Sequence, residues 1–254
     1  MKKWVLLLGA SLLLVACSPK ETKKTTRAIE SSASTVKIEE PEETTEPSEK
    51  RIENRFFEKG SLIKAVENND IHLVNQILQV KDYDINEVND KKESPLLIAT
   101  HNNQVEIAKS LIDSGADINQ QDAIQDSPYL YAGAQGKTEI LAYMMEKSTP
   151  NQRIVNRYGG NALIPAAEKG HLDNVKLLLT DKSVDINHQN DFGYTALIEA
   201  IALRDGSKVY QDIVSVLLEN GADKTLKDST GRDAEDYARE LGYGNMLKML
   251  QKAE

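Results

Sequence analysis

The sequence contains a single cysteine, Cys17, so no intramolecular disulfide can form whatever the compartment. Aromatic residues make up only 5% of the 254 residues, and a hydrophobic core therefore has to be built mainly from aliphatic side chains. Basic residues are outnumbered by acidic ones, which gives a formal net charge of −9. An acidic chain without a basic stripe is poorly suited to bind phosphate-rich surfaces, so we expect no nucleic-acid partner.

The sequence also lacks the residue groupings of an active site. Its four histidines are dispersed and none forms a His-x-x-x-His pair of metal ligands. Residues 133–138, Gly-Ala-Gln-Gly-Lys-Thr, only imitate a phosphate-binding loop, because two residues between the glycines are missing. Two interpretations of His171 and His188 stay open: the two side chains form a site together, or each has a structural role in its own loop. We expect no enzyme, no cofactor and no metal.

Long hydrophobic runs are absent except at the N-terminus. Lys2 and Lys3 precede the apolar run Trp4–Val15, which is too short to span a membrane comfortably, since spanning takes about 20 residues. The run ends in Leu14-Val15-Ala16-Cys17, which resembles the lipobox of bacterial lipoproteins. The resemblance implies a signal peptide over residues 1–16, cleavage before Cys17, and lipidation of its sulfur. The alternative is a free thiol beside an ordinary cleavage site.

Residues 17–55 are rich in Thr, Ser, Glu, Lys and Pro and have very few apolar side chains. Such a segment cannot bury enough surface to offset the entropy lost on ordering, so we predict a disordered tether. A flexible coil of this length spans about 35 Å on average. It would hold the folded part away from the bilayer, and an adhesive low-complexity ligand is the alternative.

The rest of the chain repeats with a nearly fixed period. Alanines recur at intervals of 34, 33, 34, 34 and 38 residues, which indicates a stack of supersecondary units. The six are Ala65, Ala99, Ala132, Ala166, Ala200 and Ala238. Five residues before each alanine stands a residue that caps helices well or, once, glycine. These are Gly60, Ser94, Ser127, Asn161, Thr195 and Asp233. Each unit therefore opens a helix at the same place.

Each first helix is short, and a second helix follows it. The predicted stops are residues that accept the left-handed conformation, namely Asn69, Asn103, Gly136, Gly170 and Gly242. The second helices carry apolar pairs, such as Leu111-Ile112 and Leu217-Leu218, on a helical stripe. The fifth unit carries about five extra residues around 203–210.

Each unit resembles the ankyrin repeat. The features that carry the resemblance are the helix cap, the alanine, the helix stop, the apolar pair and the ending Gly115-Ala116-Asp117-Ile118-Asn119. The resemblance covers residues 56–254 and implies an all-α ankyrin-repeat solenoid of helix-turn-helix units with finger loops, about five repeats plus a C-terminal capping repeat. Residues 156–167 in particular resemble bacterial secreted ankyrin proteins. The sequence departs from the family pattern where Leu97, Leu130, Ile164 and Ile198 replace the usual histidine, and where Pro165 lies inside the first helix.

The resemblance also implies where a partner would bind, because ankyrin repeats usually meet partners through the finger tips and the exposed end of the first helix. Carried over to this sequence, the predicted partner-binding residues are Lys91, Glu93, His101, Ile124, Asp126, Arg157, Tyr158, Lys169, Phe192, Tyr194 and Arg204. Aromatic and arginine anchors dominate interface energetics, so we expect Arg157, Tyr158, Phe192 and Tyr194 to form the centre. The alternative is that Phe192 and Tyr194 merely pack neighbouring fingers together.

We therefore expect an exported monomer, anchored to a bacterial membrane by a lipid on Cys17, whose ankyrin repeats bind another protein of the cell envelope or exterior. A second hypothesis is a receptor for a peptide or small molecule in the concave groove. A third, an enzyme, would need clustered titratable residues that the sequence does not show.

Overall fold

The computed structural model describes residues 56–253. The signal peptide predicted over residues 1–16, the lipidation of Cys17 and the tether predicted over residues 17–55 lie outside the described residues. Within residues 56–253, no helix combines the length and apolarity needed to cross a bilayer.

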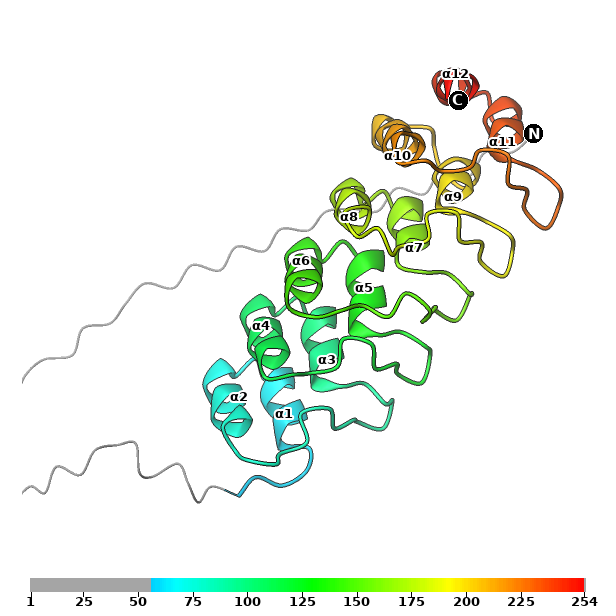
Figure 1. Ribbon diagram of the computed structural model, residues 1–254. Helices are drawn as coiled ribbons and strands as arrows, with labels where there is room; N and C mark the ends of the chain where they lie inside the picture. The colour runs from blue at the N-terminus through cyan, green and yellow to red at the C-terminus, as the bar shows by residue number, and fades with distance from the viewer. Residues whose placement is uncertain (1–55, 254) are drawn as a thin grey trace, which may run out of the picture. The chain divides into compact units, whose positions relative to one another are not determined.

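The described residues form six helix-turn-helix units and no strand (Figure 1), which confirms the predicted all-α repeat architecture. The twelve helices of residues 56–253 are α1 (Ser61–Glu67), α2 (Ile71–Leu78), α3 (Pro95–His101), α4 (Val105–Asp113), α5 (Pro128–Ala134), α6 (Thr138–Lys147), α7 (Leu163–Glu168), α8 (Leu172–Leu178), α9 (Ala196–Ala202), α10 (Lys208–Glu219), α11 (Ala234–Glu240) and α12 (Gly244–Lys252).

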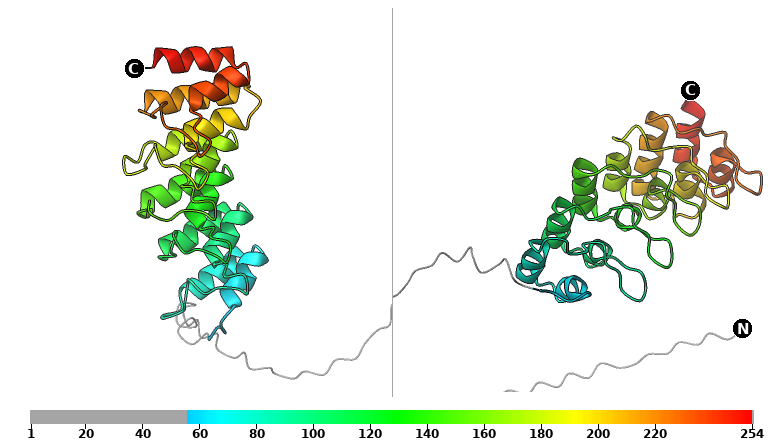
Figure 2. Two further views of the ribbon diagram at one scale, coloured as in Figure 1. Left: turned by 90° about the vertical axis from the view of Figure 1, so that its right-hand side faces the viewer. Right: turned by 60° about the horizontal axis from the view of Figure 1, so that its bottom comes forward.

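The odd-numbered helices form one row and the even-numbered helices form a second row beside it (Figures 1 and 2). Each helix packs against its partner in the same unit and against the next helix of its own row, as α7 packs against α8 and α9. The connections between units extend as finger loops from one side of the stack. Every unit therefore contacts only its neighbours, as in other repeat proteins.

The recurring alanines lie where the odd-numbered helices touch. All six are fully buried, as the sequence predicts. The contact is close enough that a Cβ added at Gly133 of α5 would lie 3.0 Å from the Cβ of Ala162, next to α7. Larger side chains at these positions would overpack the interface.

The predicted stops are present, and so are the predicted caps except at α7. That helix begins one residue late, with Ala162 as its N-cap, and Asn161 before it still accepts from the N–H groups of Leu163 and Ile164 at 3.1 and 3.2 Å. Ser94, Ser127 and Thr195 each accept a hydrogen bond of 3.2 Å from the backbone N–H three residues later. Gly60 has no side chain, and the buried carboxylate of Glu87 takes its place by accepting from the N–H groups of Gly60 and Ile63 at 2.6 and 3.1 Å. The five predicted stop residues all have φ between 54° and 77°.

The five fingers are numbered second to sixth, after the unit that each one precedes, and each is closed by one Asn or Asp side chain. Its Oδ1 accepts hydrogen bonds of 2.8–3.0 Å from the backbone N–H groups two and four residues later. These finger-closing residues are Asn89, Asp122, Asn156, Asn190 and Asp228. They stand five residues before the helix caps and are not among the residues predicted from the sequence.

Neighbouring fingers are joined by hydrogen bonds. The N–H of Asp191 donates to the carbonyl of Tyr158 at 2.9 Å, and the N–H of Ser229 donates to the carbonyl of Phe192 at 3.0 Å. The side chain of Gln121 donates to the carbonyl of Val155 at 2.8 Å. Each finger thus fixes the position of the next one.

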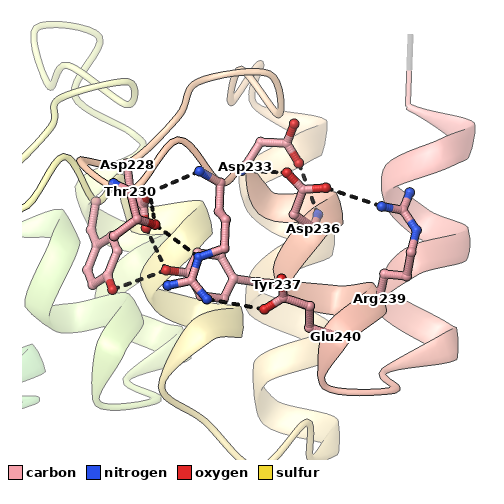
Figure 3. Close-up of polar contacts among 9 residues, drawn as sticks. Asp228, Thr230, Asp233, Asp236, Tyr237, Arg239 and Glu240 are labelled. Carbon is pink, nitrogen blue, oxygen red and sulfur yellow. Dashed lines mark hydrogen bonds and ion pairs between the residues drawn. The ribbon is translucent and has the colours of Figure 1, made fainter.

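The sixth unit ends the stack with a polar network (Figure 3). The hydroxyls of Tyr237 and Thr230 donate to the Asp228 carboxylate at 2.5 and 2.7 Å. Burial opposes ionisation of Asp228, but these bonds and two backbone N–H groups outweigh it and lower its pKa to about 2. Asp233 and Asp236 form a capping box at the start of α11, and Arg239 lies 3.2 Å from Asp236. This polar face fits the predicted capping role.

We expect the finger-closing bonds to be measurable in stability. Asn156→Ala leaves the N–H groups of Tyr158 and Gly160 without their acceptor, and we expect it to lower the free energy of unfolding by about 1 kcal/mol in urea denaturation. Asn156→Asp keeps the acceptor, as Asp122 and Asp228 do in their fingers, and should retain most of the stability. Equal losses in both variants would contradict this explanation.

Candidate functional site

A pocket of about 430 Å³ lies between the fourth and fifth fingers, on the finger side of the stack. Its walls come from two finger tips, its base from α7 and α9, and part of its rim from the residue that follows α9. The lining residues are Asn156, Tyr158, Gly160, Ile164, Pro165, Glu168, Asn190, Phe192, Tyr194, Glu199 and Leu203. Three of the four residues expected at the centre of the binding surface line this pocket or carry its walls.

The two finger tips present exposed aromatic rings. Tyr158 and Phe192 are 51% and 53% exposed, although both are large apolar side chains. The guanidinium of Arg157 lies 5.1 Å from the centre of the Tyr158 ring and 3.6 Å from the Asp126 carboxylate on the third finger. Arg157 is the fourth expected residue, and it connects the pocket to the neighbouring finger.

Tyr194 forms an inner wall instead of an exposed contact. Its ring meets the Tyr237 ring edge-on with centres 6.1 Å apart, and the two hydroxyl oxygens are 3.2 Å apart. Because the Tyr237 hydroxyl donates to Asp228, the Tyr194 hydroxyl donates to Tyr237. Tyr194 therefore packs against the next unit, which is the structural role considered as the alternative to partner binding. The Phe192 ring, in contrast, remains half exposed.

Glu199 lies at the base of the pocket and is only 5% exposed. Its Oε1 accepts a long hydrogen bond of 3.3 Å from Asn190, and its Oε2 has no partner among the described residues. Burial raises the pKa of Glu199 to about 7, nearby Glu168 adds to the rise, and Arg204 opposes it. Glu199 stands directly before Ala200, at a position whose residue type varies between repeats, and the sequence analysis missed it.

The insertion of the fifth unit forms the edge of this site. Its Arg204 binds Glu168 of α7 at 2.7 Å, and its Leu203 is 53% exposed at the rim. The Arg204 carbonyl accepts a hydrogen bond from the hydroxyl of Tyr243 in the sixth unit. The insertion is therefore held by both neighbouring units.

The remaining predicted residues lie outside the lining of this pocket, most of them towards the N-terminal end of the stack. Lys91, Glu93 and Ile124 are on the second and third fingers, where the exposed Ile124 is free of the core. The ring of His101 packs on Tyr131 with centres 4.1 Å apart, and burial lowers the pKa of His101 although Glu93 opposes this. Lys169 is exposed just after α7.

The two histidines considered as a site have separate surroundings. His188 contacts the carbonyl of Gly159 through Nε2 at 2.6 Å, and His171 precedes α8 beside Gly136. Across residues 56–253, no cluster of three or more His, Cys, Asp or Glu side chains could hold a metal ion.

Comparison with known proteins shows repeats along the whole described region. The family model described as ankyrin repeats (3 copies) matches residues 46–122, 62–154, 114–190 and 163–254. The ankyrin repeat protein YahD of Escherichia coli K12 is 36% identical over 186 residues, which are 73% of this chain and 92% of YahD. The crystal structure of EF0377, an ankyrin repeat protein, has a TM-score of 0.77 and 59% identity, covering 78% of this chain and 100% of that one.

An enzyme is among the more distant relatives. The 2-5A-dependent ribonuclease of Homo sapiens is 28% identical over 194 residues, which cover 58% of this chain but only 26% of the ribonuclease. Relatives matched over nearly their full length carry ankyrin-repeat names, and the enzyme is matched over about a quarter.

We expect the buried Glu199 carboxylate to make stability depend on pH. Its folded pKa of about 7 lies above the unfolded value, so the folded chain retains a proton that the unfolded chain has released, and stability is lost as the pH rises through 7. Glu199→Gln removes this loss. Its stability relative to the unchanged protein should therefore grow by about 2 kcal/mol between pH 5 and pH 8.

The measurement is urea unfolding at both pH values. Glu106→Gln is the control, because Glu106 lies on α4 with a side chain that is 80% exposed. A difference between Glu199→Gln and the unchanged protein that stays constant across this pH range would contradict the assignment.

Proposed function

The chain belongs to the ankyrin-repeat family, and we propose that it is a membrane-anchored scaffold that binds another protein of the bacterial cell envelope or exterior. Its binding surface consists of Arg157, Tyr158 and Phe192 together with the pocket between them. The observation that carries the proposal is the pair of half-exposed aromatic rings on adjacent fingers.

Two properties of this surface support a binding role. Tyrosine, phenylalanine and arginine supply large contact areas, and tyrosine and arginine are enriched among the residues that dominate interfaces. The rings are also carried on fingers whose tips are closed by Asn156 and Asn190 and joined by the bond from Asp191 to Tyr158. A surface held in place before binding loses less entropy when its partner docks.

Membrane anchoring is the second part of the proposal, and it is supported by the sequence near Cys17. Two or more acyl chains on this residue would hold the protein stably at a membrane surface. The segment over residues 17–55 would then act as a spacer between the bilayer and the repeats. The partner would accordingly be met at the envelope, and the protein would act as a monomer.

We also propose binding rather than catalysis. Two of the strongly shifted groups, Asp228 and Tyr237, bond to each other within the stack, so they serve the scaffold. Glu199 is a third, and the neighbouring carboxylate of the pocket, Glu168, is paired with Arg204 instead of with Glu199. The pocket volume of about 430 Å³ does fall in the range of small-molecule sites, about 300–1,000 Å³. A receptor for a peptide or small molecule is therefore the second candidate, and a ligand-induced rise in melting temperature would favour it.

We expect replacement of the exposed rings to abolish partner capture. In a crosslinking pull-down from membranes with the native, lipidated protein, the double variant Tyr158→Ala/Phe192→Ala should lose about tenfold or more of the captured partner, since truncated anchors cost about 2 kcal/mol. Helical content should not change. Tyr143→Ala on α6 is the control, because Tyr143 lies outside the pocket and bonds to Asp113. Undiminished capture by the double variant would exclude this surface.

We expect Cys17→Ala to abolish incorporation of fatty acid into the protein, because it removes the sulfur that the lipobox resemblance assigns to lipidation. Membrane fractionation and metabolic labelling with a radioactive fatty acid would measure the change. Thr22→Ala, in the predicted tether, is the control and should stay in the membrane fraction. Label retained by the Cys17→Ala protein, or no label in the unchanged protein, would overturn the lipoprotein assignment.

A further inference from the structure

The base of the pocket holds an ionisable group that the fold itself does not satisfy. Glu199 is 95% buried, and its Oε2 has no hydrogen-bond partner in the described part of the chain. A buried polar atom without a partner costs stability. The same position is filled by Ile98 in the second unit and Pro165 in the fourth, so the stack does not need a carboxylate there.

The walls above this carboxylate are apolar and aromatic. Ile164 and Pro165 of α7 line the base beside Glu199, and Leu203 lines the rim. The rings of Tyr158 and Phe192 stand at the entrance, half exposed. A largely apolar pocket with aromatic faces and an unpaired acidic group at its base complements a long aliphatic side chain that carries a positive charge at its tip.

We propose that the pocket binds a lysine side chain of the partner protein, with its ammonium group at the Glu199 carboxylate and its aliphatic stem between the fourth and fifth fingers. This inference rests on the proposed function, because it names the group of the partner that the binding surface recognises.

The hydrogen bonding of the two carboxylates favours lysine over arginine. Glu199 has one oxygen without a hydrogen-bond partner, Oε2, since Oε1 accepts from Asn190. Because Oε2 is buried, an ammonium has to displace the atoms that cover it at the base of the pocket. A guanidinium is recognised best by two acceptors at once, whereas an ammonium is a compact charge that one oxygen can bind. The second carboxylate of the pocket, Glu168, is already paired with Arg204 at 2.7 Å.

The charges around Glu199 give the proposal a distinctive pH dependence. Those that act on its carboxylate are Glu168 of α7 and Arg204 of the insertion, and in residues 56–253 neither α10 nor α11 adds another. Since the pKa of Glu199 is about 7, its ionised fraction rises from about one tenth at pH 6 to about nine tenths at pH 8. Binding of an ammonium, which needs the ionised form, should strengthen about ninefold over this range. A neutral carbonyl bound by the protonated acid would instead weaken.

The test is a titration of the full-length protein with N-acetyl-lysine methylamide, followed by NMR chemical shifts. Two further probes serve for comparison. The norleucine probe lacks the positive charge, and the arginine probe carries a planar guanidinium in place of the ammonium. We expect the lysine probe to shift resonances of Tyr158 and Phe192 and to bind about tenfold more tightly than either comparison probe. Its affinity should rise between pH 6 and pH 8 and fall about tenfold in Glu199→Gln but not in Glu106→Gln.

Equal binding of the norleucine probe, an affinity that falls with rising pH, or unchanged affinity in Glu199→Gln would each overturn the proposal. Binding of the free diamine cadaverine without binding of the lysine probe would overturn it as well, in favour of a soluble amine. An experiment that excludes lysine binding does not by itself exclude the proposed function. If Tyr158→Ala/Phe192→Ala still abolishes partner capture, the surface binds its partner through another group.

Discussion

The binding surface depends on one hydrogen-bond arrangement that recurs in every finger. A single Oδ1 of Asn or Asp accepts two backbone N–H groups and closes the tip, so the loop has a fixed shape without a strand or a core of its own. Without these hydrogen bonds, ordering such a short loop would lose conformational entropy and gain few stabilising contacts. Because each closed tip also bonds to the next one, the exposed rings of Tyr158 and Phe192 are held at a defined separation.

The alanine contacts stabilise the stack, whereas the finger tips form the proposed binding surface. Alanine brings the odd-numbered helices close together, and that spacing decides how far apart successive fingers stand. The residue directly before each alanine lies at the base of the fingers and is free to differ, as Tyr131, Pro165, Glu199 and Tyr237 do. The stack thus keeps its core constant and varies the groove by single substitutions, without disturbing the neighbouring units.

The fold could be predicted from the sequence because its signals are local and repeated. Caps such as Ser94 and stops such as Gly136 act within a few residues, and six copies in phase leave little ambiguity. The finger-closing residues are equally local, but Asn and Asp are frequent in loops of every kind, so their residue type alone does not predict this two-bond closure. The pocket could not be predicted, because it combines two fingers, two helices and an insertion. Only the assembled stack shows that Tyr194 turns inward to Tyr237 while Phe192 stays exposed.

Glu199 is where the requirements of folding and binding diverge. Burying an unpaired carboxylate lowers stability at neutral pH, so a sequence selected for stability alone would place an aliphatic residue there, as the second unit does with Ile98. The cost is kept tolerable because the pKa of Glu199 rises to about 7, which lets the free protein hold a proton. A cationic group entering the pocket would favour release of that proton to solvent and would supply the missing partner. Part of the binding free energy would then be spent on ionising Glu199, which favours selectivity for a charged ligand over high affinity.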